Sequence, residues 1–204
     1  MNKTTIVLAR HGTTEWNEKG FMQGRKDSPI TEKGLKVAHE LKEKLKDYKF
    51  DMIFSSDLLR AKRTAEIVAL EHNLDVQTTE LLRERAFGKY EGQPYEIYNE
   101  EVDKIVRELS EQEKMNYKHA KDIESYEEVA QRFLKFVREV ALLTPGKTIL
   151  ALSHGALMRS VLVKLGFTTF KELGKGFIKN GAYYVIETDG IDFELKANEG
   201  IEWE

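Results

Sequence analysis

Two histidines in this chain each end a short apolar run and precede a glycine. His11 ends such a run within IVLARHG at residues 6–12, and His154 does so within ILALSHG at residues 149–155. A short aliphatic run is typical of a buried strand, and in open α/β sheets the residues just past the strand ends face the ligand crevice. Glycine at the next position lets a ligand approach the backbone closely. We therefore expect both histidines to lie at the edge of one crevice.

Other side chains in the sequence suit these histidines to phosphoryl transfer. A neutral imidazole attacks phosphorus readily and also leaves readily, because its conjugate acid has a pKa near ~6.5. The planar fork of arginine matches phosphate oxygens in pairs, and Arg10 and Arg60 each stand close after an apolar run. A departing alkoxide needs a proton, which a carboxyl group usually supplies. Glu84, in LLRERAFG, is the candidate for that role.

The composition is that of an ordinary globular protein of 204 residues, with 41% hydrophobic and 33% charged side chains. A net charge of −3 argues against a nucleic-acid partner. The chain has no cysteine, which excludes disulfides, thiolate nucleophiles and cysteine–zinc sites. It has no visible signal peptide, and no apolar run approaches the ~20 residues of a membrane span. We expect a cytoplasmic protein without a membrane partner, and the sequence indicates no oligomeric state.

The elements that would position these residues alternate between strands and helices. Predicted strands span residues 5–9, 52–54, 75–78, 148–152, 182–187 and 193–197, and predicted helices span 31–45, 58–71, 126–143 and 156–165. Ser56 and Asp57 are the expected caps of the second of these helices. This alternation predicts an α/β fold with a mainly parallel sheet, and Asp189-Gly190 predicts an antiparallel hairpin at one edge.

Residues 88–122 differ from the rest of the chain, because they are charged, rich in tyrosine and free of strand signals. We interpret them as a helical insertion over the sheet, within a single domain that covers residues 1–204. The insertion tyrosines would either stack on a substrate or pack the insertion onto its own core. They are Tyr90, Tyr95, Tyr98 and Tyr117.

Six motifs, in order, resemble the histidine phosphatase superfamily, also called phosphoglycerate mutase-like. They are LARHGTTEWN, MQG, DSPITEKG, FSSDLLRAKRTAEI, LLRERAFGKYEG and LSHGALMR, and the match runs from residue 5 to about residue 160. The resemblance implies a three-layer α/β/α sandwich with a mainly parallel sheet. It also implies a phosphohistidine intermediate, a small phosphorylated metabolite as partner, and no requirement for a metal or other cofactor.

Roles for individual residues follow from the same resemblance. His11 would be the phosphorylated nucleophile, and Arg10, Arg60 and His154 would complete the phosphate pocket around it. Glu84 would protonate the leaving group and then, as a base, activate the water that hydrolyses phosphohistidine. Glutamates elsewhere in this region of the sequence are the alternatives for that acid, although either of them could be a solvated loop charge. They are Glu80 and Glu91.

Four further positions match residues that contact phosphate or substrate in the family. Asn17, Gln23 and Gly24 lie in the first loop, and the backbone of Gly155 would approach the ligand from the opposite side. Two of these have a structural alternative, since Asn17 could cap a turn and Gln23 could brace the loop.

The chain departs from the family pattern in two places. Arg85-Ala86 stands where relatives usually carry a hydrophobic residue followed by an acidic residue or histidine. The insertion lacks the paired arginines and the proline-rich loop typical of the cofactor-dependent mutases. These departures favour a histidine acid phosphatase that hydrolyses small phosphomonoesters, of the sugar phosphate or phosphoglycerate type. The alternatives are a phosphoglycerate mutase with the same core and an inactive module that senses phosphate.

Overall fold

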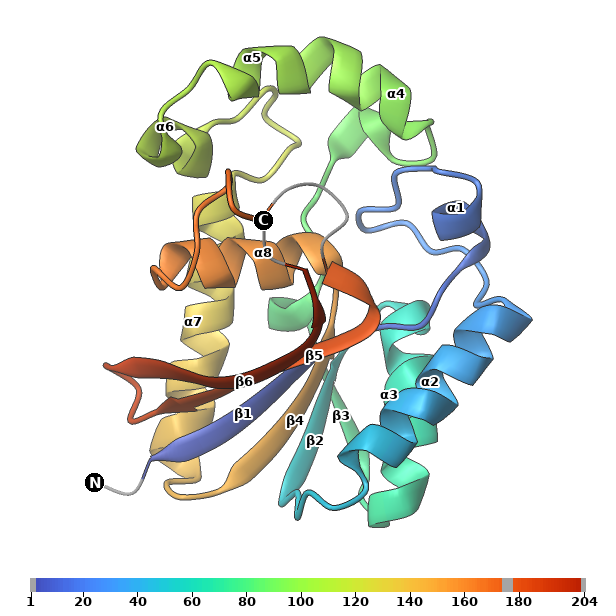
Figure 1. Cartoon of the computed structure of the whole chain (residues 1–204), viewed down its shortest axis with the longest axis vertical. Helices are drawn as coiled ribbons and strands as arrows, with labels where there is room; N and C mark the ends of the chain where they lie inside the picture. Colours follow the sequence, from blue (N-terminus) through green and yellow to red (C-terminus); the bar gives the residue numbers. More distant parts are fainter. Residues whose placement is uncertain (1–2, 174–177, 203–204) are drawn as a thin grey trace.

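Six strands form one mixed sheet in the computed structural model, which describes residues 3–173 and 178–202. The sheet order is β3-β2-β4-β1-β5-β6 (Figure 1). The strands are β1 (Thr4–Arg10), β2 (Met52–Ser56), β3 (Val76–Thr79), β4 (Thr148–Ser153), β5 (Ile178–Thr188) and β6 (Phe193–Ile201). The first four pair in parallel, whereas β5 pairs antiparallel with both β1 and β6. The predicted strands and the antiparallel hairpin are therefore confirmed.

Two layers of helices cover the sheet and complete the predicted α/β/α sandwich (Figure 1). The helices are α1 (Glu15–Glu18), α2 (Glu32–Leu45), α3 (Leu59–His72), α4 (Tyr95–Tyr98), α5 (Lys104–Arg107), α6 (Glu111–Asn116), α7 (Tyr126–Leu143) and α8 (Gly155–Lys164). Alternate residues of β1 face the two layers, as expected for a strand. Ile6 and Leu8 pack with α7 and α8, while Val7 and Ala9 pack with α2 and α3.

The predicted cap of helix α3 is wrong. Ser56 and Asp57 do not cap α3 as expected, because its N-cap is Leu58, which has no capping side chain. The cap comes instead from Asp27 in the first loop, whose carboxylate accepts a hydrogen bond from the backbone N–H of Leu59 at 2.9 Å. Capping by a residue far along the chain leaves no local signal, and here it ties the first loop to α3.

The segment 88–122 contains only short helical pieces, with a π-helical turn η3 (Asn99–Asp103) between α4 and α5. A 3₁₀ turn η2 (Gly88–Tyr90) precedes them, and an isolated bridge between Phe87 and Ile123 closes the base of the segment. A separate apolar cluster holds the segment together, and this cluster also includes side chains outside it. Its buried members are Met22, Phe87, Tyr90, Tyr98, Val102 and Ile123.

The helices of the described residues are short or carry charged side chains. None of these helices combines the length and the apolar character needed to cross a bilayer.

Candidate active site

A cavity of about 590 Å³ lies between the carboxyl ends of the parallel strands and the segment 88–122. Eight of the nine residues predicted for the site line this cavity. They are Arg10, His11, Asn17, Gln23, Gly24, Arg60, Glu84 and Gly155. The ninth, His154, does not line the cavity but lies directly beside His11. The fold therefore brings together all the residues that the sequence singled out.

His11 is held in one tautomer by two hydrogen bonds. Its Nδ1–H donates to the carbonyl oxygen of Gly12 at 2.7 Å, and its Nε2 accepts from Nε–H of Arg60 at 3.3 Å. Burial lowers the pKa of His11 well below its ordinary value, and the charges of Arg60 and Arg10 lower it further. The ring is therefore neutral at neutral pH, with the lone pair on Nε2.

His154 reaches the same place from the neighbouring strand. Because β1 and β4 pair Arg10 with Ser153, the residues that follow them lie side by side, and the two histidine rings are 5.2 Å apart. The ring of His154 is fully buried, and within the described residues neither of its nitrogens has a hydrogen-bond partner. Burial, followed by the charge of Arg60, lowers its pKa well below the ordinary value. A ligand, a water molecule or an ion can satisfy buried polar atoms of this kind.

Arg60 is fixed by three oxygens of the first loop. Its guanidinium donates to the carbonyl oxygens of Gly24 at 2.6 Å and Lys26 at 2.8 Å, and to the carboxylate of Asp27 at 2.8 Å. The side chain is only 1% exposed. Since α3 presents this residue in its first turn, the guanidinium meets His11 with little freedom to move.

Arg10 approaches the site from the end of β1. Its guanidinium donates to the carbonyl oxygen of Ile178, and its Nε is buried without a partner in the described part of the chain. A Cβ atom at Gly155 would lie 3.2 Å from this guanidinium, so the glycine after His154 is what admits the arginine.

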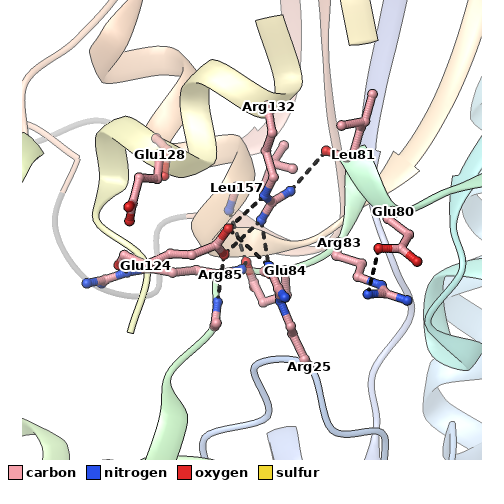
Figure 2. Close-up of polar contacts among 12 residues, drawn as sticks. Arg25, Glu80, Leu81, Arg83, Glu84, Arg85, Glu124, Glu128, Arg132 and Leu157 are labelled. Carbon is pink, nitrogen blue, oxygen red and sulfur yellow. Dashed lines mark hydrogen bonds and ion pairs between the residues drawn. The ribbon is translucent and has the colours of Figure 1, made fainter. Parts of the chain in front are cut away.

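Glu84 lies at the N-terminus of α8 (Figure 2). One carboxylate oxygen accepts hydrogen bonds from the backbone N–H groups of Arg85 at 2.8 Å and Leu157 at 3.0 Å, and the other accepts from Ala156 at 3.1 Å. The side chain is 9% exposed and its charge acts on both arginines of the site. An imidazole, two guanidinium groups and a carboxyl group thus share one cavity.

The family model described as histidine phosphatase superfamily (branch 1) matches residues 6–199. The chain belongs to this superfamily. It is 32% identical to the uncharacterized phosphatase PhoE of Bacillus subtilis (strain 168), over 79% of this chain and 77% of that protein. It is 35% identical to the probable phosphoglycerate mutase GpmB of Cronobacter sakazakii (strain ATCC BAA-894), over 82% and 77%. The solved structure of Bacillus stearothermophilus YhfR is 31% identical, with a TM-score of 0.82 and 97% of both chains covered.

Asn17 and Gln23 each contact the first loop and also line the cavity. Asn17 forms a capping box with Thr14, whose backbone N–H donates to Asn17 Oδ1 at 3.1 Å, and it also lines the cavity. Gln23 accepts a hydrogen bond from the hydroxyl of Ser28 at 3.5 Å and also lines the cavity. The structural alternatives are therefore correct for both residues, and they are compatible with ligand contact.

Asn180 is a site residue that sequence reasoning missed. Its side-chain amide donates to the carbonyl oxygen of His11 at 3.0 Å and lies 3.4 Å from Oδ1 of Asn17. It stands near the start of β5, in a polar stretch before the apolar run that predicted this strand. The apolar pattern therefore gave no signal for it.

The insertion tyrosines divide between the two predicted roles. Tyr95 and Tyr98 line the cavity, whereas Tyr90 is buried in the apolar cluster of the segment and Tyr117 packs against that cluster. Tyr95 and Tyr98 also contribute to packing, because Tyr98 belongs to the cluster and Tyr95 packs against it. Among residues 3–173 and 178–202, no group of three His, Asp or Glu side chains lies close enough together to hold a metal ion.

Proposed function

We propose that this protein is a phosphatase that hydrolyses small phosphomonoesters through a phosphohistidine on His11. The observation that carries the proposal is the hydrogen bonding of His11. Its Nδ1–H is committed to a backbone carbonyl, so the lone pair lies on Nε2, where it accepts a hydrogen bond from Arg60 that an incoming phosphoryl group would replace. A nucleophile prepared in this way, with cations around it, fits a reaction that depends on positioning and charge stabilisation.

In the first step, Nε2 of His11 forms a bond to phosphorus while the bond from phosphorus to the leaving oxygen breaks. Arg10 and Arg60 bind the phosphoryl oxygens, and His154 adds a polar ring on the same side. Glu84, in the carboxylic acid form that the negative charge of the bound phosphate favours, gives its proton to the leaving oxygen, so that an alcohol departs and the carboxylate remains.

In the second step, water attacks the phosphorus of phosphohistidine and the bond from Nε2 to phosphorus breaks. Glu84 takes a proton from this water, which restores the carboxylic acid, and inorganic phosphate is released. The side chains of the cavity thus return to their starting protonation states without a further reactant.

A phosphoglycerate mutase is the second candidate, favoured by the 35% identity to a protein named as a probable phosphoglycerate mutase. A mutase must hold the dephosphorylated sugar acid while it reorients. In this chain the segment 88–122 has one arginine, Arg107, and no arginine pair to bind a carboxylate. We therefore favour transfer of the phosphoryl group to water.

Two measurements test the proposal. With 3-phosphoglycerate and a panel of sugar phosphates, we expect release of phosphate to exceed interconversion of 2- and 3-phosphoglycerate. Fast interconversion with negligible hydrolysis would establish the mutase instead, and binding of phosphate without any turnover would indicate a sensing module. Labelled substrate should leave acid-labile, base-stable phosphate on the protein, and EDTA should leave the rate unchanged.

A further inference from the structure

A partly buried ion pair lies behind the segment that carries Glu84 (Figure 2). Arg132 of α7 donates from Nε and Nη2 to the two carboxylate oxygens of Glu124, at 3.1 and 3.3 Å, and the side chains are 13% and 17% exposed. Burial alone would raise the pKa of Glu124, but the hydrogen bond and charge of Arg132 outweigh it and lower the pKa. Neither residue lines the cavity, so neither touches the reacting atoms.

Arg132 also holds the backbone of the Glu84 segment. Its Nη1 donates to the carbonyl oxygen of Leu81 at 2.9 Å, and its Nη2 donates to the carbonyl oxygen of Glu84 itself at 3.0 Å. Residues 83–86 belong to no helix or strand, so their backbone groups depend on partners outside regular structure. The planar guanidinium presents separate N–H donors to both carbonyls and to the carboxylate of Glu124 at once.

Glu124 fixes the same segment just beyond the acid. Its carboxylate accepts from the backbone N–H of Ala86 at 2.9 Å, and its own N–H donates to the carbonyl oxygen of Ala86 at 3.1 Å. The side chain of Arg85 donates to the carbonyl oxygen of Glu124 at 2.6 Å. Glu84 is therefore held on both sides along the chain.

Glu124 connects the segment to the first loop as well. Its carboxylate pairs with the guanidinium of Arg25 at 3.1 Å. The chain neighbours of Arg25 are Gly24 and Lys26, whose carbonyl oxygens accept hydrogen bonds from Arg60. One carboxylate thus joins the part of the chain that carries the acid to the part that orients the phosphate-binding arginine.

We propose that Arg132 and Glu124 are positioning residues that set the distance between the Glu84 carboxyl group and the leaving oxygen. This inference rests on the proposed role of Glu84 as the acid. Proton transfer needs hydrogen-bond contact in the reacting complex, and a misplacement of ~1 Å can cost about 10²-fold in rate. Loosening the contacts of Arg132 with the Glu84 segment should therefore impair proton donation more than phosphate binding.

The test compares leaving groups. The value of kcat/KM is measured for p-nitrophenyl phosphate, whose phenolate departs without a proton, and for phenyl phosphate, whose phenolate is more basic. Because kcat/KM ends at departure of the leaving group, hydrolysis of phosphohistidine does not enter. Arg132→Lys keeps the positive charge but loses the forked guanidinium. We expect it to lower kcat/KM about tenfold for phenyl phosphate and less than about threefold for p-nitrophenyl phosphate.

Three further variants make the result decisive. Glu84→Gln should show the same selectivity, and adding Arg132→Lys to it should cause no further loss, since residues that act through one group are not additive. Glu127→Gln is the matched control, because this carboxylate of α7 pairs with Lys164 at 2.6 Å and touches no part of the Glu84 segment. If Arg132→Lys does not fold, Glu124→Gln, which keeps an oxygen for the N–H of Ala86, replaces it.

Equal losses on the two substrates, or additive losses in the double variant, would overturn the inference while the proposed function stands. Selective loss in Glu84→Gln with none in Arg132→Lys would have the same meaning. If Glu84→Gln itself shows no preference between leaving groups, then its role as the acid fails, and the positioning role fails with it.

Discussion

The two ends of the cavity are built in different ways. At the phosphate end, Arg10, His11 and His154 stand at the ends of neighbouring parallel strands, in a register fixed by backbone hydrogen bonds. At the other end, Tyr95 and Tyr98 stand on the four-residue helix α4, in a segment of short helical pieces. The comparison suggests that the sheet carries the chemistry common to the superfamily, while the insertion adapts the site to a leaving group.

The largest expected effect comes from removing the nucleophile at the phosphate end. His11→Ala should lower kcat/KM by at least about 10⁴-fold for every substrate, since no covalent intermediate can then form. The loss should be independent of the leaving group, and labelling of the protein by substrate phosphate should disappear. Retention of acid-labile label in this variant would place the intermediate on another residue and break the assignment of the two ends.

The next largest effect is expected from removing the acid, and it should depend on the leaving group. Glu84→Gln keeps the shape of the side chain but cannot donate the proton, so phenyl phosphate should lose about 10²-fold in kcat/KM. The loss for p-nitrophenyl phosphate should stay below about tenfold, because its phenolate needs little help. The measurement is the slope of log kcat/KM against the pKa of the leaving phenol. A slope identical to that of the unsubstituted protein would contradict proton donation by Glu84.

The same division explains what could be predicted from the sequence. Apolar runs followed by His11 and His154 predict strand ends, and parallel strands bring their carboxyl ends to one edge, so convergence of the two histidines was predictable. Residue type and position also made Arg60 and Glu84 candidates, although they lie far apart along the chain, and the motif resemblance then gave each a role. These residues stand on or beside regular elements, where local patterns determine the geometry.

Other features depend on contacts between distant segments, and no local pattern encodes them. Asp27 caps α3 from the first loop, and Asn180 reaches His11 from the polar start of β5. The positions of Glu124 and Arg132 likewise give no sequence signal, because both side chains bind backbone groups of an irregular segment. The two insertion tyrosines that line the cavity, Tyr95 and Tyr98, could not be distinguished by sequence from those that only pack the insertion.

Lowering the pH should reduce the unfolding free energy of the protein through the two histidines of the phosphate end. The pKa values of His11 and His154 are lowered by burial, so the unfolded chain binds protons below about pH 6.5 while the folded protein does not. The stability they contribute is present above that pH and is lost as the pH falls. Together they should cost about 2 kcal/mol of unfolding free energy between pH 6.5 and 5.5. The partly buried His72, whose pKa burial also lowers, adds a smaller loss of the same sign.

Urea unfolding at pH 7.5, 6.5 and 5.5 measures this effect. His154→Gln removes the titrating ring at this position. The fall in unfolding free energy between pH 6.5 and 5.5 should therefore be roughly half as large in this variant as in the unsubstituted protein. An unchanged pH dependence in this variant would show that the acid sensitivity arises away from the phosphate end.

The smallest expected effect concerns the insertion end. Tyr95→Phe removes one hydroxyl group from the cavity wall, and the loss of one hydrogen bond to a leaving group corresponds to about 2- to 10-fold in kcat/KM. The effect should differ among substrates whose leaving groups differ, while the inhibition constant of inorganic phosphate stays the same. Tyr117→Phe is the matched control, because this tyrosine lies in the same segment but does not line the cavity. A uniform effect on all substrates, with weaker inhibition by phosphate, would assign Tyr95 to the phosphate end. The phosphate end of the cavity would then extend into the insertion.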